Sequence, residues 1–129
     1  MTQKYIVGDI VEYDNKVMVA KEPRDGSHFD LSCPKEGLVY CFVGVDEVMP
    51  VRITPEILEK NGWRTQNRWY YYLDVAEGFI SYIGIDFKHK SNKGHLYVEV
   101  DGNNMVEIQY CHELQHLLYG LGINHEMEV

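Results

Sequence analysis

Two histidines and a glutamate in the segment His112-Glu113-Leu114-Gln115-His116 have the types and spacing that could support chemistry. The segment has the H-E-x-x-H pattern, which zinc peptidases carry on a helix. Histidines four apart share a helix face and can bind one zinc ion, and the adjacent glutamate can act as general base for the bound water. One interpretation is therefore a minimal zinc-dependent hydrolase or peptidase, with His112 and His116 as metal ligands and Glu113 as catalytic base.

Three observations weigh against zinc chemistry. A chain of this composition contains the pattern by accident about two or three times in a hundred such sequences. The longer metalloprotease motif needs glycine where Tyr119 stands and histidine where Gly122 stands. A third ligand is not evident, because His125, Glu126 and Glu128 lie in a terminal tail, and no second helix of comparable length is predicted. We therefore expect no catalytic residue and no cofactor, with zinc as the alternative cofactor.

The pattern lies on a helix predicted from about Gln109 to Leu121. One apolar stripe of this helix contains Cys111, Leu114, Leu117, Leu118 and Leu121. The two histidines project roughly opposite the stripe. A metal pair facing a cleft would need this orientation, and solvated polar residues opposite a core stripe would show it too.

The segments before this helix read as strands and one short helix. Short strands with tight turns fill the first 50 residues, including a hairpin of 10–13 with 16–20 around Asp14-Asn15, a loop over 22–27, a strand over 48–53 and an apolar run over 38–43 that is typical of a doubly buried strand. Thr54-Pro55-Glu56 opens a helix of about two turns that ends at Asn61-Gly62. Strands over 68–73, 79–87, 95–100 and 105–108 then form a meander, with a turn at Glu77-Gly78.

These elements predict an α+β fold in one compact domain, residues 1–129. Residues 1–53 are expected to form an SH3-like sheet or small β-barrel, and residues 54–129 a helix, an antiparallel meander and the C-terminal helix.

Composition excludes some function classes. The formal charge of −8 disfavours nucleic-acid binding, because a duplex-binding domain carries a basic footprint. No apolar run has the length of a signal peptide or a membrane span, so we expect a cytoplasmic protein without a membrane partner. Cys33, Cys41 and Cys111 lack C-x-x-C spacing and are expected to be reduced and mostly buried.

Three segments resemble a known group of proteins. Residues 108–119 resemble the C-terminal Tyr-Val-His-Gln-Leu-Gln-Asn-Leu-Tyr signature of small uncharacterised proteins carried by gut Bacteroidales, their phages and their mobile elements. Residues 6–13 are similar to the opening strand of that group, and residues 53–63 to its Leu-Thr-x-Glu-x-Leu helix. The group usually has Gln and Asn where Glu113 and His116 stand, so the resemblance implies a structural helix. It carries over no activity.

Two surface segments are candidates for binding. Trp69, Tyr70, Tyr71 and Tyr72 alternate along a strand, so one face can complete a core while the other presents an aromatic contact patch. The basic cluster Lys88–Lys93 could hold a phosphate or an acidic partner, although such runs are usually solvated turns.

Taken together, the sequence predicts a non-enzymatic accessory protein of a phage or mobile element in its bacterial host. We expect it to bind a host protein, another macromolecule or a small-molecule ligand, and association into a homo-oligomer stays open. Counter-defence is one use that the resemblance implies.

The zinc interpretation has a direct test. Since a third ligand is missing from the pattern, purified protein should contain no stoichiometric zinc by elemental analysis. One tightly held zinc per chain, lost in a His116→Ala variant, would contradict this expectation.

Overall fold

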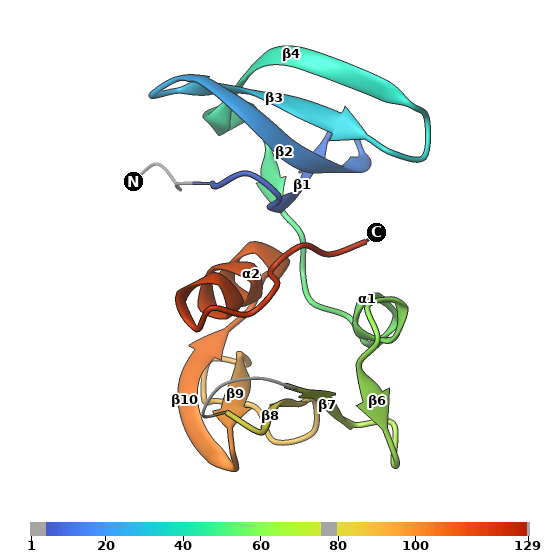
Figure 1. Ribbon diagram of the computed structural model, residues 1–129, viewed down its shortest axis with the longest axis vertical. Helices are drawn as coiled ribbons and strands as arrows, with labels where there is room; N and C mark the ends of the chain where they lie inside the picture. Colours follow the sequence, from blue (N-terminus) through green and yellow to red (C-terminus); the bar gives the residue numbers. More distant parts are fainter. Residues whose placement is uncertain (1–4, 76–79, 129) are drawn as a thin grey trace. The chain divides into compact units, whose positions relative to one another are not determined.

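The computed structural model describes residues 5–75 and 80–128, which form two compact units. Unit 1 contains the chain up to Arg52 and the segment Tyr110–Met127, and unit 2 contains Ile53–Gln109 and Glu128. Unit 1 comprises β1 (Ile10–Tyr13), β2 (Lys16–Asp25), β3 (His28–Cys33), β4 (Leu38–Gly44), η1 (Val45–Glu47), β5 (Met49–Pro50) and α2 (Cys111–Gly120). Unit 2 comprises α1 (Pro55–Lys60), β6 (Arg64–Thr65), β7 (Tyr70–Asp74), β8 (Tyr82–Asp86), β9 (Leu96–Val100) and β10 (Asn103–Ile108). The two sheets and two helices confirm the predicted α+β class (Figure 1).

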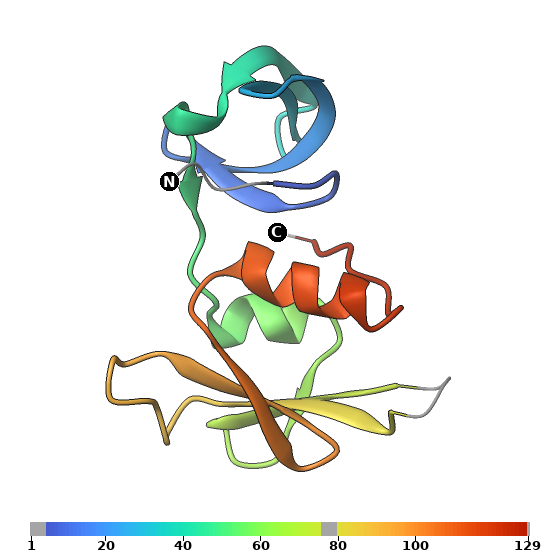
Figure 2. The ribbon, with the colours of Figure 1, turned by 90° about the vertical axis from the view of Figure 1, so that its left-hand side faces the viewer.

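The sheet of unit 1 is antiparallel, with the strand order β4-β3-β2-β1-β5. Its first hairpin is the predicted one, because Asp14 and Asn15 both adopt positive φ, at 52° and 60°, as a two-residue primed turn requires. The sheet is strongly curled (Figure 2). One core cluster lies on it and consists of Val11, Met18, Ala20, Phe29, Leu31, Cys33, Val43 and Val48.

The small barrel expected for residues 1–53 is wrong, because the strands form an open sheet. No closed barrel is found among the described residues, since β4 and β5 are the two edge strands and do not pair with each other. The physical reason is that β5 has only two residues, one of them Pro50, which has no N–H to donate.

Two local expectations in unit 1 are also wrong. The turn-rich residues 22–25 continue β2, because they pair with β3 through shifts in register, and only Gly26-Ser27 form the turn. The apolar run in β4 is a strand, but it is an edge strand and most of it is exposed, including the thiol of Cys41. Cys33 and Cys111 are buried, as expected.

Unit 2 is a meander with the strand order β10-β9-β8-β7-β6. The predicted strands are present, while the turn expected at Glu77-Gly78 lies outside the described residues. Helix α1 begins as predicted, because the Thr54 hydroxyl accepts the Ile57 N–H at 3.3 Å and Pro55 needs no N–H partner.

The two faces of the unit 2 sheet differ in character. The register puts Tyr71, Ile85 and Val98 in one row on the inner face, and all three are buried. Helix α1 lies over this face, where Glu59 accepts a hydrogen bond from the Tyr71 hydroxyl at 3.1 Å (Figures 1 and 2). The side chains that alternate with these along each strand lie on the opposite, outer face.

Helix α2 is buried on more than its leucine stripe. Leu114 and Leu118 are buried as predicted, but His112 and Gln115 are buried as well. The idea that the polar side of this helix is solvated is therefore wrong. Among the described residues no helix is long and apolar enough to cross a membrane.

Burial of the stripe sets its contribution to stability. Leu114→Ala and Leu118→Ala should each lower the free energy of unfolding by about 2–5 kcal/mol, because each removes a buried side chain and leaves a cavity. Tyr119 on the same helix is 63% exposed, and Tyr119→Ala is the matched control with a loss within about 1 kcal/mol. Urea melts of the three variants measure this, and equal losses for all three would contradict it.

Candidate functional site

The glutamate of the H-E-x-x-H pattern caps its own helix. Glu113 lies in the first turn of α2, and its Oε1 accepts the Tyr110 N–H at 2.9 Å. The next backbone amide, that of Cys111, donates to the Val51 carbonyl at 2.7 Å. Because the carboxylate is at the helix N-terminus, where negative charge is favourable, its position is explained by capping. The contact gives no support to a role as base for a metal-bound water.

His112 is a core histidine. It is 6% exposed, and its ring makes edge contacts with Tyr5 and His116 at centroid distances of 5.2 and 5.7 Å and stacks on Tyr110 at 5.9 Å. Burial lowers the pKa of His112, so the fold favours its neutral form. Its Nδ1 is buried and has no hydrogen-bond partner among the described residues.

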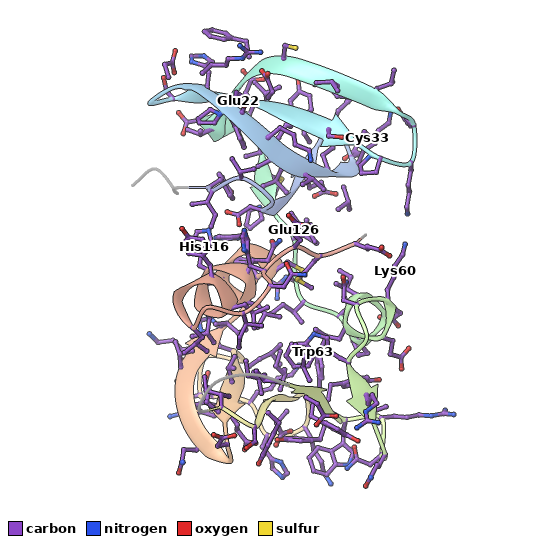
Figure 3. All side chains as sticks on the ribbon, viewed as in Figure 1. Glu22, Cys33, Lys60, Trp63, His116 and Glu126 are labelled. Carbon is purple, nitrogen blue, oxygen red and sulfur yellow. The ribbon has the colours of Figure 1, made fainter. Side chains whose placement is uncertain are left out.

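His116 pairs with a buried carboxylate from the segment before β1. Its Nε2 lies 2.6 Å from Asp9 Oδ2, and the same oxygen accepts the Ile6 N–H at 2.8 Å. Asp9 is fully buried. The side chain of His116, labelled on α2 in Figure 3, is 35% exposed. Burial raises the pKa of Asp9, and the bonds from Ile6 and His116 oppose that shift. In some enzymes an Asp–His pair accepts a proton from water. Here the pair connects α2 to the chain segment before β1.

Gln115, between the two histidines, makes the most extensive contacts. Its Oε1 accepts the Ile10 N–H at 2.8 Å, and its Nε2 donates to the carbonyls of Gly8 at 2.7 Å and His125 at 3.0 Å. The side chain is fully buried and joins three chain segments. These hydrogen bonds of Gln115 anchor the helix to the chain before β1 and to the tail.

The histidines are not part of a ready metal site. In the part of the chain that the structure describes, no group of three or more His, Cys, Asp and Glu side chains is arranged to hold a metal ion. Asp9 is in direct contact with His116, and Glu113 is at the helix N-terminus. The described residues therefore do not fit the ligand set that zinc needs.

The aromatic segment of unit 2 divides between the two sheet faces. Tyr71 is buried, whereas Tyr70 and Tyr72 lie half-buried on the outer face. The Tyr70 hydroxyl donates to Glu99 at 2.7 Å and its ring covers Gly84, where even a Cβ would collide with it. Burial and the Glu99 carboxylate raise the Tyr70 pKa far above its usual value. Trp69 precedes the strand, with its ring in edge contact with that of Tyr70.

Further tyrosines and carboxylates extend this outer face. The register places Tyr82 beside Asp74, and Tyr97 beside Asp86. We call this surface the tyrosine face and define it as Tyr70, Tyr72, Asp74, Tyr82, Asp86, Tyr97, Glu99 and Glu107. Sequence reasoning located only its first two members. Alternation along the later strands could have found the others.

The basic cluster Lys88–Lys93 belongs to unit 2, and two of its side chains contact residues of that unit. Lys88 Nζ lies 5.3 Å from the centroid of the Trp69 ring, and His89 Nδ1 lies 2.9 Å from Asp86 Oδ2. All three of its lysines, Lys88, Lys90 and Lys93, are exposed. These contacts fit an anchored turn and do not converge on a phosphate site.

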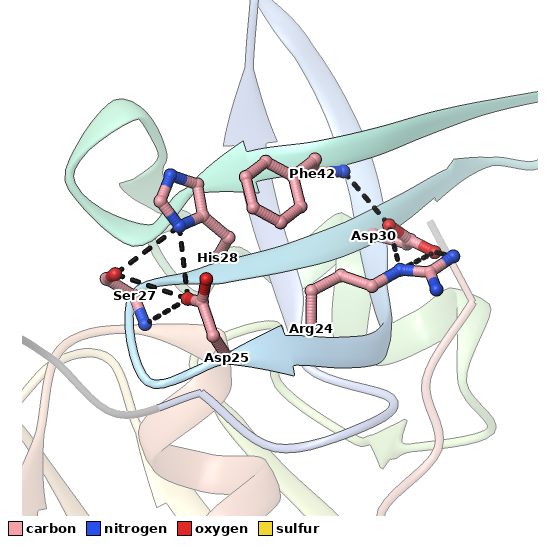
Figure 4. A network of polar contacts seen from close by, with 6 residues as sticks. All are labelled: Arg24, Asp25, Ser27, His28, Asp30 and Phe42. Carbon is pink, nitrogen blue, oxygen red and sulfur yellow. Dashed lines mark hydrogen bonds and ion pairs between the residues drawn. The ribbon is translucent and has the colours of Figure 1, made fainter.

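A polar network at the β2–β3 turn was not singled out by the sequence (Figure 4). His28 Nδ1 lies 3.0 Å from Asp25 Oδ1 and 3.3 Å from Ser27 Oγ. A catalytic triad needs the carboxylate on one ring nitrogen and the hydroxyl on the other. Here both contact the same nitrogen, so the three residues form a turn and not a relay.

The turn borders a pocket in unit 1. The pocket has a volume of about 610 Å³, within the range of small-molecule sites. Its aromatic wall includes Tyr5 and Phe29, whose rings are stacked at 5.8 Å, and its polar lining includes Lys21 and Asp46. Sequence reasoning missed it, because its walls come from segments far apart in the chain.

Comparisons with known proteins return no relationship: no family model, no curated protein and no solved structure matches this chain.

The contact between His116 and Asp9 predicts a loss of stability when the His116 side chain is removed. A solvated His116 would cost little to remove, but His116→Ala leaves the buried Asp9 carboxylate without its ring partner and should cost about 1–3 kcal/mol of unfolding free energy. In an Asp9→Asn background the same change should cost much less. Urea melts of both single variants and the double variant measure the coupling. Additive losses would show that the two side chains do not interact energetically.

Proposed function

We propose that this chain is a non-enzymatic binding protein whose contact surface is the tyrosine face of unit 2. In this proposal its partner is a basic segment of a host protein. The resemblance to proteins of gut Bacteroidales, their phages and mobile elements extends the proposal to an accessory role for such an element, with counter-defence as one use. The observation that supports the proposal most directly is the cluster of half-buried tyrosines and carboxylates on one sheet face, opposite the face that packs on the core.

Tyrosine is well suited to such a contact. Its ring offers a large, rigid area at low cost in conformational entropy, and interfaces are enriched in it. The rings of Tyr70 and Tyr72 are held by contacts within the sheet, since Tyr70 bonds to Glu99 and Tyr72 lies under Arg64. A partner would therefore meet a surface that is already ordered.

Arg64 shows how this face binds a cationic side chain. The Arg64 guanidinium lies 5.3 Å from the centroid of the Tyr72 ring, and its Nη2 contacts the Asp74 carboxylate at 2.5 Å. An arginine from a partner could make the same combination of ring stacking and ion pairing on Tyr97 beside Asp86 and Glu107. Lysine lacks the planar group that stacks, so the face should prefer arginine.

Electrostatics favour the same class of partner. The chain has a net charge of −8, and the tyrosine face contributes Asp74, Asp86, Glu99 and Glu107. An acidic field attracts basic segments and repels phosphate backbones. The proposal therefore concerns a protein partner and not a nucleic acid.

The pocket of unit 1 favours a second candidate function, binding of a small ligand. Its volume of about 610 Å³ and its stacked Tyr5 and Phe29 rings suit a small molecule with an apolar ring. Binding there would involve no residue of the tyrosine face, so substitutions on that face separate the two candidates.

The proposal predicts selective binding of an arginine-rich peptide. Fluorescence anisotropy with labelled arginine-rich, lysine-rich and glutamate-rich peptides of equal length should rank their affinities in that order. Tyr97→Ala and Glu107→Gln should each weaken binding of the arginine-rich peptide about threefold to tenfold, because each removes part of the ring stacking and ion pairing that the partner's arginine would make.

Matched control variants distinguish binding at the tyrosine face from attraction by the overall negative charge of the chain. Tyr119→Ala removes an exposed tyrosine, and Glu22→Gln an exposed carboxylate, both in unit 1. Neither should change the affinity by more than about twofold. Tyr71→Ala should instead lower the melting temperature, because that ring is buried. Equal weakening by the face variants and the controls would contradict the proposal.

A further inference from the structure

Strand β4 exposes an apolar edge in unit 1. It pairs with β3 on one side and is the last strand of the sheet on the other. Its residues, Leu38 to Gly44, include no charged side chain. Leu38 is 49% exposed, Val39 63% and Phe42 57%.

The other three sheet edges of the described chain are protected in ways that natural proteins commonly use. β5 and β6 have two residues each, with Pro50 in β5 and Arg64 in β6, while β10 carries Glu107. Short length, proline and charge all discourage pairing with another strand. β4 has seven residues and none of these side chains.

The sequence of β4 is that of a strand with neighbours on every side. A continuous apolar run is typical of strands in the interior of a sheet structure, and an edge strand normally alternates or carries charge. In unit 1 a neighbour is present only at β3. A further strand at the outer edge would pair with the backbone groups of β4 there and place its side chains beside the exposed Leu38, Val39 and Phe42.

We infer that this strand is β4 of a second copy of the chain, paired antiparallel about a two-fold axis near Tyr40. The pairing would join two five-stranded sheets into one continuous sheet. A two-fold axis makes the interface self-complementary, so the exposed apolar side chains of each copy would cover those of the other.

Charges at the two ends of β4 favour the antiparallel arrangement. Lys35 precedes the strand, and its neighbour Glu36 is already paired with Lys16 at 2.9 Å. Asp46 and Glu47 follow the strand. Antiparallel pairing brings the basic start of one strand beside the acidic end of the other, whereas parallel pairing would bring like charges together.

A bulge limits the length of the pairing. Phe42 has a φ of 57°, and its N–H donates to Asp30 at 3.0 Å, where the β3–β4 register shifts. Arg24 holds the same carboxylate. The regular part of the edge is therefore Leu38–Cys41, and so short a pairing covers less than the roughly 1,600 Å² of a standard interface. The dimer should be weak and concentration-dependent.

Sedimentation velocity of the full chain from about 10 μM to about 1 mM tests the inference, with a dissociation constant of about 100 μM expected. Val39→Lys places a charge at the centre of the edge and should weaken dimerisation more than about tenfold. Val106→Lys is the matched control, because Val106 is an exposed valine on the edge strand β10 of the other sheet. It should leave the dissociation constant unchanged.

A charge exchange tests the antiparallel pairing. Lys35→Glu and Asp46→Lys should each weaken the dimer about threefold or more at low salt, and the double variant should restore it. Circular dichroism melts check that every variant is folded. A chain that stays monomeric over the whole concentration range overturns the inference, and so does equal weakening by Val39→Lys and Val106→Lys.

Discussion

The buried amide of Gln115 is the interaction on which the organisation of unit 1 depends. One side chain on α2 binds the Ile10 amide and the Gly8 carbonyl, more than 100 residues earlier in the chain, and the His125 carbonyl ten residues later. An unpaired polar group in such a place would cost about 1–3 kcal/mol, so these partners must stay together. The first strand, the last helix and the tail are thereby fixed in one unit. The Asp9–His116 contact adds a second link beside the first.

This arrangement also accounts for the H-E-x-x-H pattern. Each of its polar residues has a contact inside unit 1: Glu113 caps the helix, His116 contacts Asp9, and His112 packs among aromatic rings. A hydrolase would need the two histidines and the glutamate directed at one metal-bound water. The geometry supports the other expectation from the sequence, that the pattern is a local variation on a structural helix.

Local chemistry made much of the fold predictable. Asp14-Asn15 specified the first hairpin, Thr54-Pro55 the start of α1, and the leucine spacing α2, since each depends on neighbouring residues alone. Contacts between distant residues could not be predicted in this way. Nothing near His116 in the sequence points to Asp9, which is 107 positions away. The apolar run of β4 indicated a strand but not its position in the sheet, because periodicity does not say which element covers a residue. The tyrosine face was partly predictable. The alternation within each strand is visible in the sequence, but only the register of the strands shows that these side chains share one face.

Hydrogen exchange of the Ile10 amide, followed by NMR, tests the role of Gln115 most directly. Gln115→Met keeps the size of the side chain but removes its acceptor and its donor. If the amide of Gln115 holds α2 to the start of β1, Ile10 should exchange about tenfold to a hundredfold faster in the variant, relative to the amides of β8 in unit 2. Unchanged protection of Ile10 would contradict this account, because packing alone would then be holding the helix in place.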